Sequence, residues 1–174
     1  VIYGCANQAG EDNRNVARMA SLLAGLPPEV PGQTINRLCA SGMNTAVSAY
    51  HAIKAGEGDL FITGGVEHMT RGPMVLGKGS RPYSGTNEMY DTTFGWRFVN
   101  DKLDEEYGSD AMGQTAENVN EMHDIGRKDQ DKFAAWSQQK AAKATENGRY
   151  AKEIVSVEIP QRKSDPILFE KDEF

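Results

Sequence analysis

The stretch NRLCASG at residues 36–42 decides the fold class of this chain and the chemistry expected of it. An apolar run ends there in Cys39, and a segment with helical periodicity begins immediately afterwards. A cysteine at a strand-to-helix turn faces the free N–H groups and the positive dipole end of the helix, which favour its thiolate form. Because the thiolate is the nucleophilic form, we interpret Cys39 as an acyl-accepting nucleophile rather than as a thiol that only packs in a core.

Length and composition predict a folded protein that binds neither nucleic acid nor a membrane. The 174 residues are 39% hydrophobic, which is enough to build one ordinary domain or two small ones. Lys and Arg total 19 against 25 Asp and Glu, so a net charge of -6 lacks the basic footprint of a nucleic-acid binder. No apolar run approaches the ~20 residues needed to span a bilayer. We expect a soluble cytoplasmic protein with no nucleic-acid or membrane partner.

The two cysteines, Cys5 and Cys39, are too few for a disulfide scaffold and belong to no CxxC or histidine-rich metal pattern. We therefore expect reduced thiols and no metal. The chain opens on VIYGC, which is typical of the inside of a strand, and closes on the acidic EKDEF. We expect it to be truncated at both ends.

The first 65 residues alternate between strand-like and helix-like patterns. Strands are expected at residues 1–5, 34–38 and 60–63, the last followed by a tight turn at Gly64–Gly65. A helix capped by Asp12 or Asn13 should lie between the first two strands, and a second helix should run from Cys39 to a cap at Gly56. The apolar residues expected to be buried by these helices are Val16, Ala20, Leu23, Met43, Val47, Tyr50 and Ile53. This order predicts an α/β fold with a parallel sheet and helices packed on it.

The composition changes near Arg71, and the stretch to about residue 108 is rich in Gly, Pro, Tyr and charge without a sustained period. A long excursion of this kind is usually functional or a small domain in its own right. Helical patterns follow at 115–125 and 129–147, the second bringing Phe133 and Trp136 together, and strand-like alternation resumes at 155–159.

Three motifs, NRLCASG at 36–42, GGVEHMT at 64–70 and MGQTAENV at 112–119, resemble the thiolase family in order and spacing. The resemblance covers essentially the whole chain. The stretches GCANQAGEDNRN at 4–15 and DTTFGWRF at 91–98 are most similar to the branch of the family that acts on 3-oxoadipyl-CoA in aromatic catabolism. The resemblance implies an α/β thiolase-like fold, with a parallel-rich mixed sheet flanked by helices and an inserted α/β loop domain.

The resemblance also implies where the domains lie. Residues 1–70 correspond to the N-terminal core half-domain, without the family's first strand and helix. Residues 71–174 correspond to the loop domain, without its C-terminal part. Thiolases assemble through their N-terminal halves, so we expect a homodimer or homotetramer, with Arg14 near the dimer interface.

The activity implied by the resemblance is acyl transfer between acetyl-CoA and an acyl-CoA. Cys39 would attack the 3-keto carbonyl of a 3-oxoacyl-CoA, and free CoA would later take the acyl group from the sulfur. Coenzyme A is a substrate, and no cofactor is implied. The family's base lies in a Gly-His-Pro motif and its proton donor in a Cys-x-Gly-Gly-Gly motif, neither of which occurs here. We therefore expect the 174-residue chain alone to be inactive.

The three histidines do not replace the missing base. His51 lies roughly 18 Å beyond Cys39 along the helix, at 1.5 Å per residue, which is too far for a hydrogen bond. His68 follows the third strand, where the family usually carries a small polar residue, and His123 lies in a polar helix. Glu67, which precedes His68, is interpreted as an acceptor for backbone donors rather than as a catalytic acid.

Substrate contacts are expected from the second part of the chain. Met112 matches a family position against the pantetheine arm of CoA, and a methionine that fills the core is the alternative. Ala111 departs from the family, whose acetoacetyl-type members often carry a histidine there. A 3-oxoadipyl substrate brings a free carboxylate, for which Arg97, Arg81 and Lys78 are candidate partners.

Three other functions fit parts of the sequence. One is an acetoacetyl-CoA thiolase, and another is a thiolase-like protein that binds acyl-CoA or lipid without chemistry. A cysteine hydrolase satisfies the nucleophile pattern alone, but the residues after Cys39 match no hydrolase motif. The retained cysteine and the three ordered motifs favour the acyltransferase.

Overall fold

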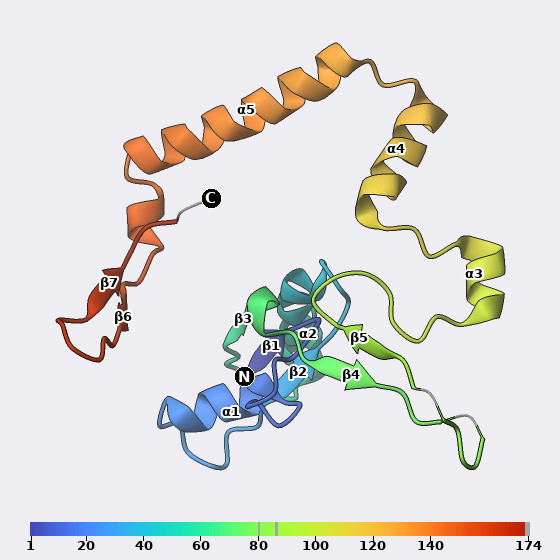
Figure 1. Cartoon of the computed structure of the whole chain (residues 1–174). Coiled ribbons are helices and arrows are strands. Elements are labelled where there is room, and N and C mark those ends of the chain that lie inside the picture. Colours follow the sequence, from blue (N-terminus) through green and yellow to red (C-terminus); the bar gives the residue numbers. More distant parts are fainter. Residues whose placement is uncertain (80, 86, 173–174) are drawn as a thin grey trace. The chain divides into compact units, whose positions relative to one another are not determined.

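The computed structural model describes residues 1–79, 81–85 and 87–172 of the chain (Figure 1). It divides into two compact units, Val1–Ala111 and Met112–Phe174, each of which is described by itself. The division separates parts of the chain that are each compact, and its boundary at residue 111 differs from the domain boundary expected at residue 71. That expected domain boundary stays a prediction.

The first unit is built on a three-stranded sheet with strand order β2-β1-β3. The strands are β1 (Ile2–Gly4), β2 (Gln33–Ile35) and β3 (Thr63–Gly65). Both pairings of β1 are parallel, and Tyr3 lies opposite Thr34 on one side and Gly64 on the other. The prediction of an α/β fold with a parallel sheet is confirmed.

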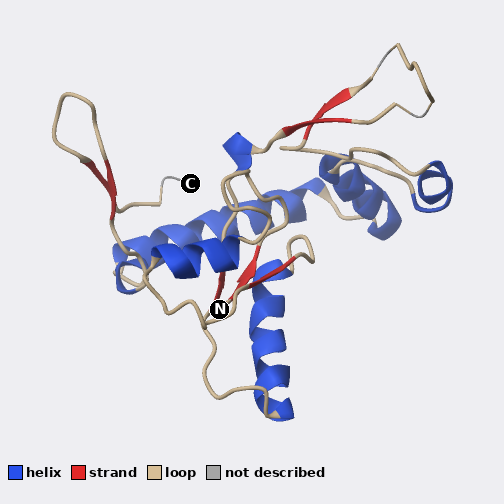
Figure 2. Cartoon of the chain, turned by 90° about the horizontal axis from the view of Figure 1, so that it is seen from below, coloured by secondary structure: helices blue, strands red, loops and turns tan. Residues whose placement is uncertain are grey.

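Helices α1 (Val16–Leu23) and α2 (Ser41–Ala55) cover opposite faces of this sheet (Figure 2). Thr34 points to α1, because its Oγ1 accepts a hydrogen bond from the N–H of Ala17 and donates one to Asn15. Gly4, on the other face of the pleat, lies directly against the start of α2. Crossovers between parallel strands are right-handed as a rule, and a step from β1 out to β2 followed by a step back past β1 to β3 then places the two helices on opposite faces.

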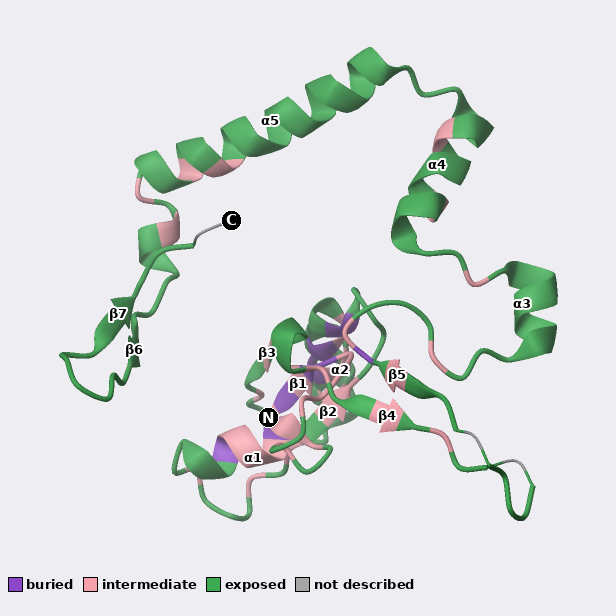
Figure 3. Cartoon of the chain, in the orientation of Figure 1, coloured by how far each residue is buried: buried purple, intermediate pink, exposed green. Residues whose placement is uncertain are grey.

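The buried residues lie in the first unit, where Figure 3 shows them in purple, and most of them have small side chains. The apolar ones are Ile2, Cys5, Ala17 and Ala49, and Ser21, Ser41, Thr45 and Thr92 are buried polar residues. The expectation that the large residues of these helices are buried is wrong for most of them, because Leu23 is 89% exposed and Met43 76% exposed. The face of α2 that contacts the sheet carries Ser41, Thr45 and Ala49, whose small side chains let the helix approach β1 closely, and this turns Met43, Val47, Tyr50 and Ile53 outward.

Several element ends differ from those expected. Asn15, not Asp12 or Asn13, caps α1, since its side chain accepts the N–H of Arg18. The third strand contains the two glycines instead of ending before them. A Cβ on Gly65 would lie 2.8 Å from the carbonyl oxygen of Gly4, so the glycine pair serves close strand packing rather than a tight turn. The predicted cap of α2 at Gly56 is confirmed, with φ of 77°.

The stretch after β3 holds more regular structure than its composition indicates. A 3-10 turn at Met69–Arg71 precedes the antiparallel pair β4 (Met74–Leu76) and β5 (Met89–Asp91), and α3 (Asp101–Tyr107) follows. Asn7 ties this stretch to the sheet, because its Nδ2 donates to the carbonyl oxygen of Thr92 at 3.0 Å and to the Thr92 hydroxyl at 3.1 Å.

The second unit contains two helices and a hairpin. Its elements are α4 (Met112–His123), α5 (Arg127–Glu146), a 3-10 turn at Tyr150–Lys152, and the antiparallel pair β6 (Val157–Ile159) and β7 (Ile167–Phe169). Phe133 and Trp136 come together, as predicted, and their rings pack edge to face with centroids 6.3 Å apart. Over the residues the structure covers, none of the helices has the length and apolar character required to cross a membrane.

Candidate active site

Cys39 lies in the turn that joins β2 to α2, and it is exposed. The helix begins at Ser41, and Ala40 at its N-cap has no side chain that could accept the first N–H groups. Free N–H groups at a helix start carry partial positive charge and favour an anion beside them. The predicted position of Cys39 at a strand-to-helix turn is therefore present in the fold, and its role as nucleophile stays a prediction.

The residue before the nucleophile candidate has an unusual backbone. Leu38 has φ of 51°, a left-handed conformation that side chains other than glycine rarely adopt. The N–H of Leu38 donates to Asn36 Oδ1 at 2.9 Å, and its carbonyl oxygen accepts the Ser41 hydroxyl at 2.6 Å. The same hydroxyl accepts the N–H of Arg37 at 2.9 Å. Two polar side chains thus hold the turn in a conformation that has an energetic cost.

This conformation corrects the expected second strand, which was predicted to run through Leu38. The strand ends at Ile35, and Leu38 is 70% exposed in the turn. A strained turn between a strand and a helix is also how α/β-hydrolases hold a nucleophile out from the sheet. Leu38 therefore belongs to the turn before Cys39, although its apolar side chain indicated a strand residue.

A second group of contacts lies at the same edge of the sheet, where β1 ends. Glu67 accepts hydrogen bonds from the N–H groups of Ala6 and Asn7. Asn36 donates from Nδ2 to the carbonyl oxygen of Ala6 at 3.1 Å. The interpretation of Glu67 as an acceptor for backbone donors is confirmed. The function of Asn36 as a bridge between two loops was not predicted, because its partners are set by the fold.

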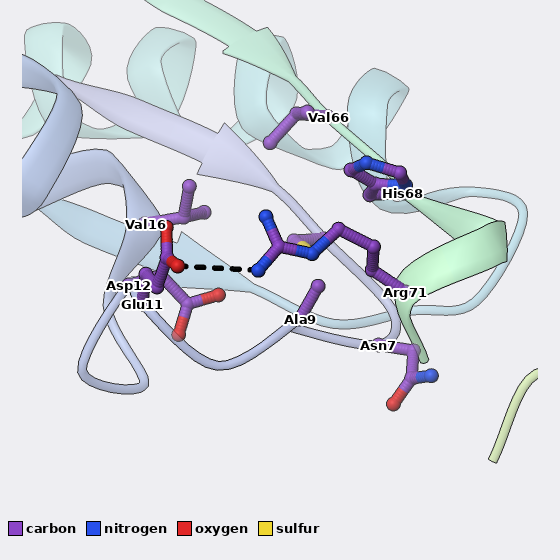
Figure 4. A pocket seen from close by; sticks show the side chains of 9 residues that line it. Asn7, Ala9, Glu11, Asp12, Val16, Val66, His68 and Arg71 are labelled. Carbon is purple, nitrogen blue, oxygen red and sulfur yellow. Dashed lines mark hydrogen bonds and ion pairs between the residues drawn. The ribbon is translucent and has the colours of Figure 1, made fainter. Parts of the chain in front are cut away.

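A cavity of about 160 Å³ lies beside the exits of β1 and β3. Figure 4 shows its two walls, one from the segment after β1 and the start of α1, the other from the segment after β3. Its polar lining is Asn7, Glu11, Asp12, His68 and Arg71. Arg71 reaches across to Glu11, with Nη2 3.1 Å from Oε1. Crevices outside the carboxyl ends of parallel strands are the usual ligand sites of such sheets.

Cys5 lines this cavity and is 5% exposed, whereas Cys39 does not line it. Burial raises the pKa of the Cys5 thiol above its ordinary value, and the negative charge of Glu67 raises it further. Cys5 is therefore a neutral thiol at physiological pH, which makes it a poor nucleophile. Of the two cysteines, Cys39 is the exposed one, so it stays the candidate nucleophile.

The other residues singled out from the sequence are spread over the chain. His51 is exposed on α2, and His68 lines the cavity with Nδ1 3.2 Å from the Thr70 hydroxyl. His123 ends α4, and Met112 begins it with 79% of its surface exposed. Arg14 is exposed before α1. None of these residues is brought to Cys39 by a hydrogen bond among those the described residues make.

Of the three basic candidates for a substrate carboxylate, Arg97 is the one brought to the sheet edge. It is half-buried, and its Nη2 lies 3.5 Å from Asn7 Oδ1. Lys78 and Arg81 are exposed in the loop between β4 and β5. In the part of the chain that is described, no cluster of three or more His, Cys, Asp or Glu side chains could hold a metal ion.

The fold and the site define a protein that presents an exposed cysteine where a strand of a parallel α/β sheet leads into a helix. The chain belongs to the thiolase family, because residues 1–174 match the family model described as thiolase, N-terminal domain. The resemblance seen in the three sequence motifs is thereby confirmed.

Individual relatives agree with this assignment. The chain is 58% identical over 173 residues to a beta-ketoadipyl-CoA thiolase of Acinetobacter baylyi, and 57% identical to a 3-oxoadipyl-CoA/3-oxo-5,6-dehydrosuberyl-CoA thiolase of Escherichia coli. Each match covers 99% of this chain but 43% of the relative, so the chain spans less than half the length of these proteins. The crystal structure of human mitochondrial 3-ketoacyl-CoA thiolase is 29% identical, with a TM-score of 0.81 over 99% of this chain and 42% of that one.

Proposed function

We propose that the protein carrying this chain is an acyl-CoA:acetyl-CoA C-acyltransferase that cleaves 3-oxoadipyl-CoA to acetyl-CoA and a shortened acyl-CoA. The observation that carries the proposal is an exposed Cys39 at the start of α2 in a chain 58% identical to a beta-ketoadipyl-CoA thiolase. The names of the relatives support the substrate class, and the exposed position of Cys39 before α2 supports its role as the nucleophile.

The reaction proceeds in two steps. The Cys39 thiolate attacks the C3 carbonyl carbon, the C2–C3 bond breaks, and its electron pair goes to C2, which takes a proton and leaves as acetyl-CoA. The thiolate of a second CoA then attacks the thioester carbonyl, the C–S bond to Cys39 breaks, and the enzyme thiolate is restored. Dividing the cleavage through a thioester replaces one difficult step by two easier ones. We expect the base and the second proton donor from residues outside this chain.

The experiment is to incubate the complete gene product that carries this chain with acyl-CoA and to look for a mass increase on the peptide holding Cys39. We expect the added mass of an acyl group, and we expect none in Cys39→Ser. Incubation of the 174-residue chain should give no CoA-dependent cleavage. Binding of acyl-CoA with no acylated Cys39 would instead favour a thiolase-like carrier.

The distal carboxylate of the substrate is assigned to Arg97 in this proposal. Arg97 lies by Asn7 at the edge of the sheet that also presents Cys39, which supports the assignment. We expect Arg97→Ala to lower kcat/KM for 3-oxoadipyl-CoA by at least about tenfold, since hydrogen bonds to charged groups contribute about 1.5–3 kcal/mol. Activity on acetoacetyl-CoA, which lacks the carboxylate, should change by less than about twofold, within the ~0.5 kcal/mol expected of a surface change.

Arg127→Ala removes a surface arginine that pairs with Asp131 along one helix, and it serves as the matched control. Equal losses on both substrates would remove Arg97 from the assignment, and greater activity of the wild type on acetoacetyl-CoA would favour an acetoacetyl-CoA thiolase.

We further propose a cytoplasmic homodimer or homotetramer, with Met112 against CoA. Light scattering after size-exclusion chromatography tests the assembly, and a stable monomer of the complete gene product would contradict it.

A further inference from the structure

The segment where β1 ends is fixed from both neighbouring strands. On one side Glu67, just after β3, accepts the N–H groups of Ala6 and Asn7. On the other side Asn36, just after β2, donates to the carbonyl oxygen of Ala6. The N–H and the C=O of one residue, Ala6, are therefore both held by side chains from the two flanking strands.

Asn36 uses both ends of its amide. While Nδ2 binds Ala6, Oδ1 accepts the N–H of Leu38 at 2.9 Å. One short side chain thus connects the exit of β1 to the residue that precedes Cys39. The left-handed φ of Leu38 needs such support, because an unsupported leucine would relax toward an ordinary conformation and shift the cysteine that follows.

We propose that Asn36 and Glu67 are positioning residues for Cys39. Glu67 fixes the backbone of Ala6 and Asn7, and Asn36 relays that fixed position to Leu38, whose conformation sets where Cys39 lies against the start of α2. This inference rests on the proposed function, since it concerns the geometry of the same nucleophile. Among the hydrogen bonds given for the described residues, those of these two side chains go to Ala6, Asn7 and Leu38, not to Cys39. Their effect on rate comes through placement, and a displacement of about 1 Å in an active site can cost about a hundredfold.

The first test is Asn36→Asp in the complete gene product. The carboxylate keeps an acceptor for Leu38 but sets an oxygen against the carbonyl oxygen of Ala6, where Nδ2 donates. We expect kcat to fall about tenfold and KM to stay within about twofold, the pattern of a lost transition-state interaction.

Asn44→Asp is the matched control. It adds the same charge to the first turns of α2, while its carboxylate can still accept the Arg37 guanidinium that lies 2.9 Å from Asn44 Oδ1. Asn44 is half-buried, and the aspartate gives up only the long hydrogen bond from Nδ2 to the Ser48 hydroxyl at 3.4 Å, so we expect its kcat to stay within about twofold of the wild type. An equal loss in both variants would mean that charge near Cys39, not the bond to Ala6, lowers the rate, and would overturn the proposal.

The second test is a graded pair at Glu67. Glu67→Gln keeps one acceptor for the two N–H groups, and Glu67→Ala keeps none. We expect the kcat of the glutamine variant to lie between those of the wild type and the alanine variant, with Glu57→Gln as the control at an exposed carboxylate outside the network. This milder substitution keeps the proposal testable if Asn36→Asp does not fold.

The outcomes separate this inference from the proposed function. Absence of a thioester on Cys39 in the wild type would remove the proposed function, whatever the variants do. A thioester in the wild type, together with kcat within about twofold in Asn36→Asp and Glu67→Ala, would refute the positioning role alone. A lower Tm with unchanged kcat per folded molecule would also refute it, because it would reduce both residues to structural contacts.

Discussion

Replacing Gly4 by alanine should destabilise the first unit and disturb the start of α2. A Cβ at Gly4 would lie 2.6 Å from the carbonyl carbon of Ser41 and 2.7 Å from the backbone nitrogen of Gly42. Ordinary contact begins at 3.4 Å, so the helix would have to move by about 0.8 Å. The atoms met are backbone and cannot rotate away. Over-packing typically costs about 1–3 kcal/mol, and we expect the upper end of that range here.

The assay is urea unfolding of the 174-residue chain, followed by circular dichroism and by hydrogen exchange of the peptides from α2. Gly42→Ala is the matched control at the same helix end, because its Cβ would meet no atom within 4 Å. Alanine is the better helix former, so this variant should gain about 0.5–1 kcal/mol. Equal unfolding free energies for Gly4→Ala and the wild type would refute the close contact between β1 and α2.

Three further predictions concern the cavity and its neighbours. Burial raises the pKa of the Cys5 thiol, so the folded state holds the thiol proton more tightly than the unfolded state does. The free energy of unfolding should therefore fall as the pH rises above 9.0, the ordinary pKa of a cysteine thiol. Cys5→Ala should remove that fall, as measured by urea titrations at a series of pH values. Arg71→Ala should change the unfolding free energy by less than about 0.5 kcal/mol, because its pair with Glu11 is exposed to solvent; a larger loss would show that the pair closes the cavity wall. Asn7→Ala should cost about 1–2 kcal/mol by leaving the buried Thr92 without two hydrogen bonds, and should speed hydrogen exchange in β5; unchanged exchange there would contradict the link.

The sequence predicted those features that depend on neighbouring residues. The cap at Gly56 follows from a local rule, and the cysteine between a strand pattern and a helix pattern placed the candidate nucleophile correctly at a turn. The pairing of Phe133 with Trp136 also follows from helical spacing alone. In each case the residues that decide the structure lie within a few positions of one another.

The rest could not be predicted because it depends on residues far apart in the chain. The hydrogen bond from Asn36 to Ala6 joins positions 30 apart, and although Glu67 was expected to accept backbone N–H groups, its partner Asn7 lies 60 positions away. The third strand was placed at the apolar run before Gly64, whereas the glycines themselves pair with β1. Their lack of a side chain matters only once Tyr3 and Gly4 lie beside them.

The choice of buried face on α2 has the same origin. Hydrophobicity indicated Met43 and Val47, but the sheet beneath the helix presents Gly4 and admits small residues such as Thr45, which is 1% exposed. A pattern of hydrophobicity identifies a helix with one buried and one solvent-exposed face. It does not predict how closely the sheet approaches the buried face.

The strand order β2-β1-β3 leaves the outer rims of β2 and β3 without a further strand among the described residues. An unpaired edge strand exposes a row of backbone N–H and C=O groups, which can hydrogen-bond to a strand of another chain. A purified sample of these 174 residues should consequently self-associate through strand addition as its concentration rises, and short peptides that mimic a neighbouring strand should suppress that aggregation.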